Sequence, residues 1–216
     1  DTSSSRLLPL YYVSRMKDGQ EKIYYASGES VDKIDMLPVV ERFKDKEYEV
    51  LYLNDYVDEF TLQSLMEYDG HKFVNVNNDD VDLDTDEEKE ELKKRNEDSK
   101  DMFEFMNEVL DEVKTVRFTN KLKKHPVCLS TEGNISLEME KVLNSMPDAQ
   151  KVKAEVVLEI NEEHPIADKL KDLYESDKSK LEKYTKVLYN QARLIEGLEI
   201  DNPTELTSII CDLMSK

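Results

Sequence analysis

The sequence has few of the residues by which metal sites, disulfide frameworks and many catalytic sites are recognised. It contains 2 cysteines, 3 histidines and no tryptophan among 216 residues. Cys128 and Cys211 lie far apart, so neither a zinc site nor a disulfide framework is predicted, and a reducing cytoplasm fits this usage best. The histidines are equally scattered and form no H-E-x-x-H segment, so no metal site is predicted either.

Glycine is scarce as well, with 5 residues in the chain. The sequence contains neither of the glycine-rich phosphate-binding motifs, G-x-G-x-x-G and G-x-x-x-x-G-K-[ST], and no G-x-S-x-G segment of the kind that holds a nucleophilic serine. Glu162 and Glu163 beside His164 are interpreted as the acidic start of a helix at Pro165, because carboxylates stabilise the positive end of a helix dipole. No catalytic residue and no cofactor-binding residue is therefore predicted.

Long apolar runs and an excess of positive charge are also missing. No apolar stretch approaches the roughly 18–20 residues that cross a bilayer, and the first residues lack the basic and apolar regions of a signal peptide. The formal net charge of −19 repels the phosphates of nucleic acids and anionic lipids. We therefore expect no membrane and no nucleic-acid partner. Hydrophobic residues make up 38% of the chain, which is low but sufficient for two modest cores.

The first third of the chain alternates strand and helix patterns. Short β-type runs occupy residues 23–26, 49–53 and 72–76, and helical patterns lie between them, one of them over residues 58–68. Strands and helices that alternate in this way form layers in which the helices cover a sheet. The sequence therefore predicts a small α/β subdomain over residues 1–83.

The remainder predicts a second core. Residues 84–100 are strongly acidic and are interpreted as a linker or the start of a helix. Within a predicted domain of residues 101–216, strand patterns at 116–119, 126–129 and 156–160 indicate a three-stranded sheet with helices around it. The fold class expected for the whole chain is α+β or α/β.

The last two helical patterns, residues 178–200 and 203–214, each have one apolar face. Asn202 is suited to cap the second helix, Pro203 to begin it, and Glu205 follows at the capping-box spacing. A helix of about twelve residues is marginal in water unless its apolar face is covered. We predict that a second copy of the chain covers it, the alternative being packing within the same domain. Burying four such side chains is worth about 6–12 kcal/mol per subunit before ordering costs.

A second amphipathic helix is predicted from Met139, Val142, Leu143 and Met146, which repeat with helical spacing before Pro147. From the pattern alone, packing of this stripe in the domain's own core is favoured. The alternative is an exposed stripe, because flexible and polarizable methionines recur on surfaces that bind varied partners.

Several segments resemble one protein family. Residues 12–25 read YVSRMKDGQEKIYY and match the family's YVxRMKxGQxxIYY segment, and residues 67–70 resemble its EFDG segment. Residues 158–166 are similar to its ELNPxHPL motif, with Asn161-Glu162 in place of Asn-Pro. Over nearly its whole length the chain resembles the 90-kDa heat-shock chaperones, specifically their bacterial branch. Residues 1–10 match poorly and are interpreted as an end foreign to the family.

The resemblance implies a fragment that contains the last α/β subdomain of the chaperone's middle domain and its C-terminal dimerisation domain. The family's ATPase domain, which binds ATP and magnesium, lies outside it. The fragment is therefore expected to be no enzyme and to bind no cofactor itself. The resemblance also implies a cytoplasmic location, and because the chain lacks the MEEVD tail, no tetratricopeptide co-chaperone is expected.

The resemblance implies two sets of binding residues. A homodimer would form through a four-helix bundle of the C-terminal helices from two copies, using Leu188, Leu194, Ile195, Leu206, Ile209, Ile210 and Leu213. Unfolded client proteins would bind an exposed apolar surface made of Phe60, Met139, Val142, Leu143 and Met146. At the position of Phe60 some members of the family have tryptophan. This exposed surface reverses the preference for core packing stated above. The rival interpretation is an acidic structural module that binds other proteins but no unfolded chains, and a nucleotide-binding enzyme is a more distant alternative.

Overall fold

The computed structural model describes residues 11–55, 57–78, 81, 83–147 and 151–215. Contacts divide the chain into two compact units, one of Asp1–Val81 with Gly133–Ala154 and the other of Asp82–Glu132 with Glu155–Lys216. This grouping places residues 133–154 with the first unit, whereas the sequence assigned them to the second domain. The predicted boundaries concern domains that fold independently, and they stay a prediction.

The first unit is built on a four-stranded sheet in the order β2-β1-β4-β3. The central strand β1 (Lys22–Ser27) runs parallel to β2 (Leu51–Leu53) and to β4 (His71–Asn75), while β3 (Glu67–Tyr68) is antiparallel to β4. The predicted strand runs are confirmed, although β2 is shorter than expected. The sequence did not predict β3.

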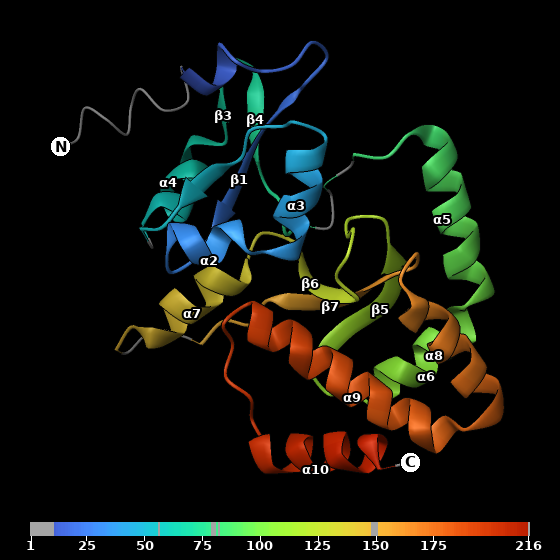
Figure 1. Cartoon of the computed structure of the whole chain (residues 1–216). Helices are drawn as coiled ribbons and strands as arrows, with labels where there is room; N and C mark the ends of the chain where they lie inside the picture. The colour runs from blue at the N-terminus through green and yellow to red at the C-terminus, as the bar shows by residue number, and fades with distance from the viewer. Residues whose placement is uncertain (1–10, 56, 79–80, 82, 148–150, 216) are drawn as a thin grey trace. The chain divides into compact units, whose positions relative to one another are not determined.

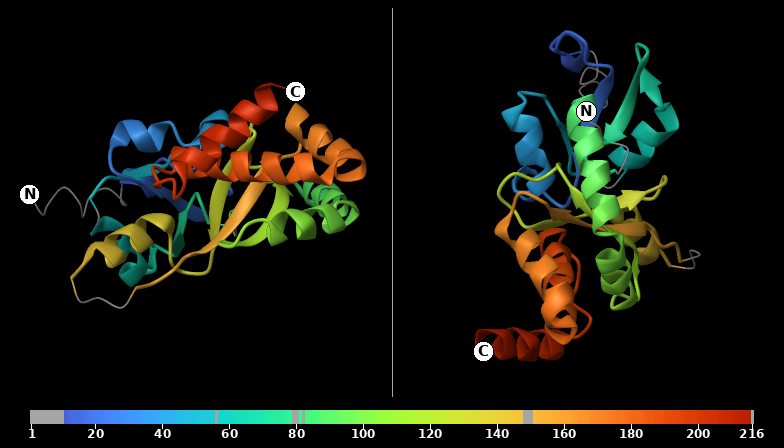
Figure 2. Two further views of the ribbon diagram at one scale, coloured as in Figure 1. Left: turned by 90° about the horizontal axis from the view of Figure 1, so that it is seen from below. Right: turned by 90° about the vertical axis from the view of Figure 1, so that its right-hand side faces the viewer.

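Helices cover both faces of this sheet. Helices α2 (Val31–Asp35) and α3 (Pro38–Asp45) lie on one face and α4 (Asp58–Leu65) on the other (Figures 1 and 2). The predicted α/β layer is therefore confirmed. Helix α4 ends before the predicted residue 68, because Met66 adopts a φ of 64° and turns the chain into β3. The unit also contains α7 (Leu137–Ser145), the predicted methionine-containing helix.

The second unit contains the predicted three-stranded sheet, in the order β5-β7-β6. The middle strand β7 (Glu155–Asn161) is parallel to β5 (Val113–Thr119) and antiparallel to β6 (Val127–Glu132). Helix α6 (Lys100–Glu108) contacts β5, and α8 (Pro165–Ser176) contacts β7.

The acidic segment before this sheet is mostly helical. Helix α5 (Asp86–Asp98) begins with a capping box, in which Thr85 and Glu88 satisfy each other's backbone N–H groups. Glutamates and aspartates crowd its first turn, where the helix dipole favours negative charge. Of the two readings of this segment, the start of a helix is therefore the one observed.

The chain's last two helices are α9 (Lys178–Ile195) and α10 (Pro203–Met214). Helix α9 ends five residues before the predicted residue 200, because Gly197 adopts a φ of 67° and reverses the chain. The predicted cap of α10 is confirmed, since Asn202 Oδ1 accepts the backbone N–H of Glu205 at 3.1 Å. Within this unit α9 lies between the sheet and α10 (Figures 1 and 2). The predicted four-helix bundle needs a second copy and stays a prediction.

Candidate functional site

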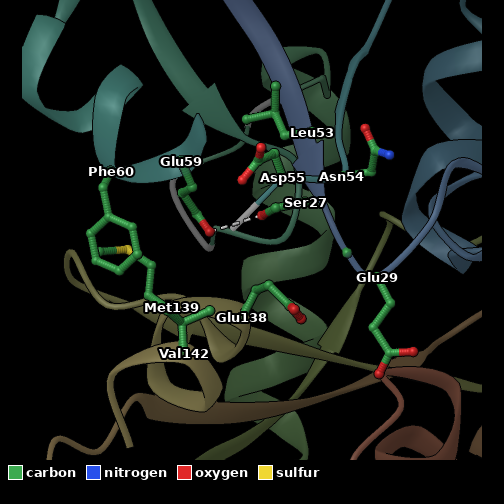
Figure 3. Close-up of a pocket in the computed structure, with 11 residues that line it drawn as sticks. Ser27, Glu29, Leu53, Asn54, Asp55, Glu59, Phe60, Glu138, Met139 and Val142 are labelled. Carbon is green, nitrogen blue, oxygen red and sulfur yellow. Dashed lines mark hydrogen bonds between the residues drawn. The ribbon is translucent and has the colours of Figure 1, made fainter. Parts of the chain in front are cut away.

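A pocket of about 270 Å³ lies within the first unit, at the ends of β1 and β2 (Figure 3). Strands β1 and β2 are parallel and pair Ser27 with Leu53, so their carboxyl ends lie at the same edge of the sheet. Helices α4 and α7 complete the wall. The lining residues are Ser27, Gly28, Glu29, Leu53, Asn54, Asp55, Glu59, Phe60, Glu138, Met139 and Val142.

Glu59, in the first turn of α4, is the buried polar centre of this region, with 3% of its surface exposed. Its Oε2 accepts hydrogen bonds from Ser27 Oγ at 2.9 Å and from Ser136 Oγ at 2.8 Å. Its Oε1 accepts from Asn75 Nδ2 at 2.8 Å and from Tyr25 Oη at 3.3 Å. A buried carboxyl group thus accepts hydrogen bonds from four donors, none of which is a lysine or an arginine.

The hydrogen bonds to Glu59 affect the pKa of Tyr25 and the position of helix α7. Burial raises the pKa of Tyr25, and the adjacent charge of Glu59 raises it further. Ser136 also accepts the backbone N–H of Met139 at 3.1 Å and so caps α7 while it donates to Glu59. A single serine hydroxyl therefore links the start of α7 to Glu59 of α4. The sequence analysis did not identify Glu59 or Ser136.

The structure brings three of the five predicted client-binding residues to this pocket. Phe60, Met139 and Val142 line it, whereas Leu143 and Met146 do not. Met139 is only 4% exposed, and its sulfur accepts a hydrogen bond from Gln63 Nε2 at 3.0 Å, so the prediction that this residue is exposed is wrong. Met146, at the end of α7, is 47% exposed, as predicted for it.

The predicted dimerisation residues differ in burial. Leu188 is buried within its own unit, while Leu194 is 57% exposed and Ile195 is also exposed. None of the twelve residues of α10 is buried. The apolar stripe of α10 is half-buried at Leu206, Ile209, Ile210 and Leu213.

Polar contacts join α10 to α9. Lys183 Nζ lies 2.9 Å from Asp212, and Lys186 Nζ lies 3.4 Å from Glu205. Arg193, in the last turn of α9, pairs with Asp201 in the connection to α10, and this bond lowers the pKa of that carboxyl. Partly exposed ion pairs therefore connect α10 to α9, while the apolar residues of α10 keep part of their surface in solvent.

The second unit contains a buried charge cluster that the sequence analysis missed. Glu159 on β7 is 1% exposed and is the direct neighbour of Arg117 on β5 and of Cys128 on β6. Arg117 Nη2 lies 2.8 Å and Lys121 Nζ 3.2 Å from its carboxylate. Burial opposes the charged form of Glu159, but the two cations outweigh this and lower its pKa. The one available signal was a glutamate inside an otherwise apolar strand pattern.

His164 has a structural role. Its Nδ1 accepts the backbone N–H of Ile166 at 3.1 Å and so caps α8, which begins at Pro165. The interpretation of this segment as a helix start is therefore confirmed. Across the described residues, no group of three potential ligands is arranged to hold a metal ion. No helix in the described ranges has both the length and the apolar character needed to cross a membrane.

Comparison with known proteins gives a consistent result. The family model described as Hsp90 protein matches residues 3–216, so the interpretation of residues 1–10 as foreign to the family is wrong from residue 3 onward. The chain is 52% identical over 204 residues to a protein of Clostridium acetobutylicum named chaperone protein HtpG, and 49% identical to the protein of that name from Bacillus subtilis. Each alignment covers 94% of this chain but only 32% or 33% of the relative. The chain thus spans about a third of the length of these relatives, and it belongs to the Hsp90 family.

Proposed function

We propose that this segment joins two copies of a bacterial chaperone and supplies part of the surface that binds unfolded client proteins. The observation that carries the proposal is the apolar stripe on α10, a helix in which no residue is buried. The relatives that match the chain are named chaperones. ATP and magnesium would act in a part of the protein outside this segment, which would itself be no enzyme. A cytoplasmic location is part of the same proposal.

The incomplete burial of the C-terminal helices supports the proposed dimer. A helix of about twelve residues gains little from propensity alone and needs its apolar face covered. Leu206, Ile209 and Ile210 recur with helical spacing and are only half-buried within one chain. A twofold axis would let the same stripe of a second copy cover each of them. The exposed Leu194 would extend this interface along the end of α9.

The substitution Ile210→Asp tests the dimer. It removes one apolar side chain per copy, worth about 3–6 kcal/mol for the two together, so the dissociation constant should rise about 10²–10⁴-fold. Light scattering coupled to size-exclusion chromatography across a range of concentrations measures this change. Ser208→Asp places the same charge on the exposed, opposite side of α10 and should leave the dimer intact. A parent chain that is monomeric at every concentration would contradict the proposal.

The apolar residues that α4 and α7 contribute to the first unit support the proposed client binding. Phe60, Met139 and Val142 line one pocket, and the exposed Met146 follows at the end of α7. An aromatic ring beside flexible methionines can adapt to many side chains, which suits the binding of varied unfolded segments.

Met146→Ser tests this second part. We expect weaker suppression of the aggregation of an unfolded protein, with the dimer unchanged, because an exposed apolar contact is removed and no core residue is disturbed. Met36→Ser is the matched control, since Met36 is an exposed methionine of the first unit outside the pocket and α7. Equal suppression by the parent chain and Met146→Ser would contradict the role of this exposed residue. If none of the three proteins suppressed aggregation, the rival function would be favoured, an acidic structural module without affinity for unfolded chains.

A further inference from the structure

The pocket at the ends of β1 and β2 has an acidic side as well as an apolar one. Its lining includes Glu29, Asp55, Glu59 and Glu138, and among the residues that the structure describes neither lysine nor arginine lines it. The apolar side consists of Phe60, Met139, Val142 and Leu53. Figure 3 shows Phe60 and Met139 at one end of the pocket and Glu29 at the other, with Glu138 between them.

Lysines near the rim compensate only part of this charge. Glu29 pairs with Lys33, and Glu138 lies 3.0 Å from Lys141. Glu59 is different, because the four hydrogen-bond donors that contact its carboxyl group carry no positive charge.

Asp55 adds to this negative potential. Its Oδ1 accepts the backbone N–H of Val57 at 3.2 Å, a bond that brings no positive charge to the carboxylate. Burial raises the pKa of the neighbouring Asp58 carboxyl, and the charge of Asp55 raises it further. Negative potential therefore persists at the end of the pocket formed by α4 and the loop after β2.

We propose that this pocket binds a lysine or arginine side chain of an unfolded client segment. The methylene groups of such a side chain would pack against Phe60, Met139 and Val142, and its cation would lie near Asp55, Glu59 and Glu138. Long basic side chains combine an apolar stem with a charged end and so match a pocket with these two sides. A volume of about 270 Å³ is just below the roughly 300–1,000 Å³ of small-molecule sites, which fits a single side chain.

This inference rests on the proposed client binding and makes it more specific. An apolar surface alone would accept any hydrophobic segment, whereas this pocket would prefer segments in which a basic residue lies among apolar ones. Charge complementarity of this kind improves selectivity more than total affinity.

The test uses the full chain and two fluorescein-labelled peptides of glycine and serine, one with a central Leu-Lys-Leu and one with norleucine replacing the lysine. We expect the lysine peptide to bind about 3- to 10-fold more tightly, as for a partly exposed ion pair. The preference should decrease as salt is added. Fluorescence anisotropy measures both affinities.

Two variants test whether the preference for the lysine peptide arises in this pocket. Glu138→Gln and Asp55→Asn should each reduce it, and in the second variant the side-chain amide oxygen can still accept the Val57 N–H. Glu67→Gln removes an exposed carboxylate on β3, outside the pocket, and should leave the preference unchanged. Circular dichroism confirms that each variant is folded.

Three results would overturn the inference. Equal affinity of the parent chain for the two peptides would do so, as would an undiminished preference in both pocket variants. In either case, capture of a reduced and alkylated unfolded protein, measured in parallel, would leave the broader client-binding function standing. If the chain bound neither peptide and captured no unfolded protein, the proposed function itself would fail.

Discussion

Replacing Arg117 by methionine should strongly destabilise the second unit. The substitution retains much of the apolar stem of the side chain but removes the hydrogen bonds that Arg117 Nε and Nη2 donate to Glu159 at 3.1 and 2.8 Å. Lys121, whose Nζ lies 3.2 Å from Glu159, would then face a carboxylate that is 1% exposed without the help of Arg117. Removing one partner from a buried ion pair typically costs about 3–5 kcal/mol, because the remaining charge stays buried without full compensation.

The magnitude can be measured by thermal unfolding. For a chain of this length, 1 kcal/mol corresponds to about 2–4 °C, so the midpoint should fall by about 6–20 °C. Circular dichroism at a fixed protein concentration is the appropriate assay, because a change in dimer population would also move the midpoint. Lys114→Met is the matched control, since Lys114 also pairs with glutamates of this sheet but is exposed, and its effect should be far smaller.

The dependence on pH gives a second readout. In the parent chain the pKa of Glu159 is lowered, so the stabilisation it provides is present above the unfolded-state pKa and is lost as the pH falls through the folded-state pKa. In Arg117→Met one of the two cations that lower the pKa of Glu159 is missing, so the folded-state pKa should be higher than in the parent. The stability difference should therefore decrease as the pH is lowered toward 4. A difference below about 1 kcal/mol at pH 7, or one that increases in acid, would refute this account of the cluster.

Two further substitutions test the caps of the site helices. Ser136→Ala should lower the free energy of unfolding by about 1–3 kcal/mol, because it removes both the cap of α7 and one of the four donors to the buried Glu59. Urea denaturation measures this loss. The control is Ser145→Ala, which alters an exposed serine at the other end of α7. Asn202→Ala should lower the stability of α10 by about 1 kcal/mol and weaken the proposed dimer, because the start of the helix would fray. Asn202→Asp can still cap the helix and should have neither effect. An unchanged dissociation constant of the dimer in Asn202→Ala would contradict the role of this cap.

Much of the fold could be predicted because its signals are local. Pro203 begins α10 at the position predicted for it, and Asn202 caps this helix as expected. The predicted ends were less accurate where a single residue adopts a positive φ. Met66 ends α4 and Gly197 follows the end of α9, and neither is part of a periodic pattern.

The polar parts of the site could not be predicted in the same way. Glu59 meets Ser136 across 77 positions of sequence, and Glu159 meets Arg117 across 42, so no local pattern connects them. The methionine helix shows the same limit. Its spacing predicted one apolar face, but tertiary contacts such as that of Met139 with Gln63 decide which residues of this face are buried, and Met139 is buried while Met146 is exposed. Periodicity identifies the apolar face of a helix, but long-range packing determines which part of the protein covers that face.

The two proposed roles depend on each other through effective concentration. A pocket for one basic side chain gains only the modest energy of a partly exposed ion pair, which is too little to retain an unfolded protein alone. Two copies joined through α10 would present two such pockets to one client, and the second binding step would then be intramolecular. Weak, selective pockets would release individual segments quickly, while the proposed dimer would keep the whole client nearby. A chain that joined two copies but lacked selective pockets, or had pockets without a partner copy, would lose one half of this mechanism.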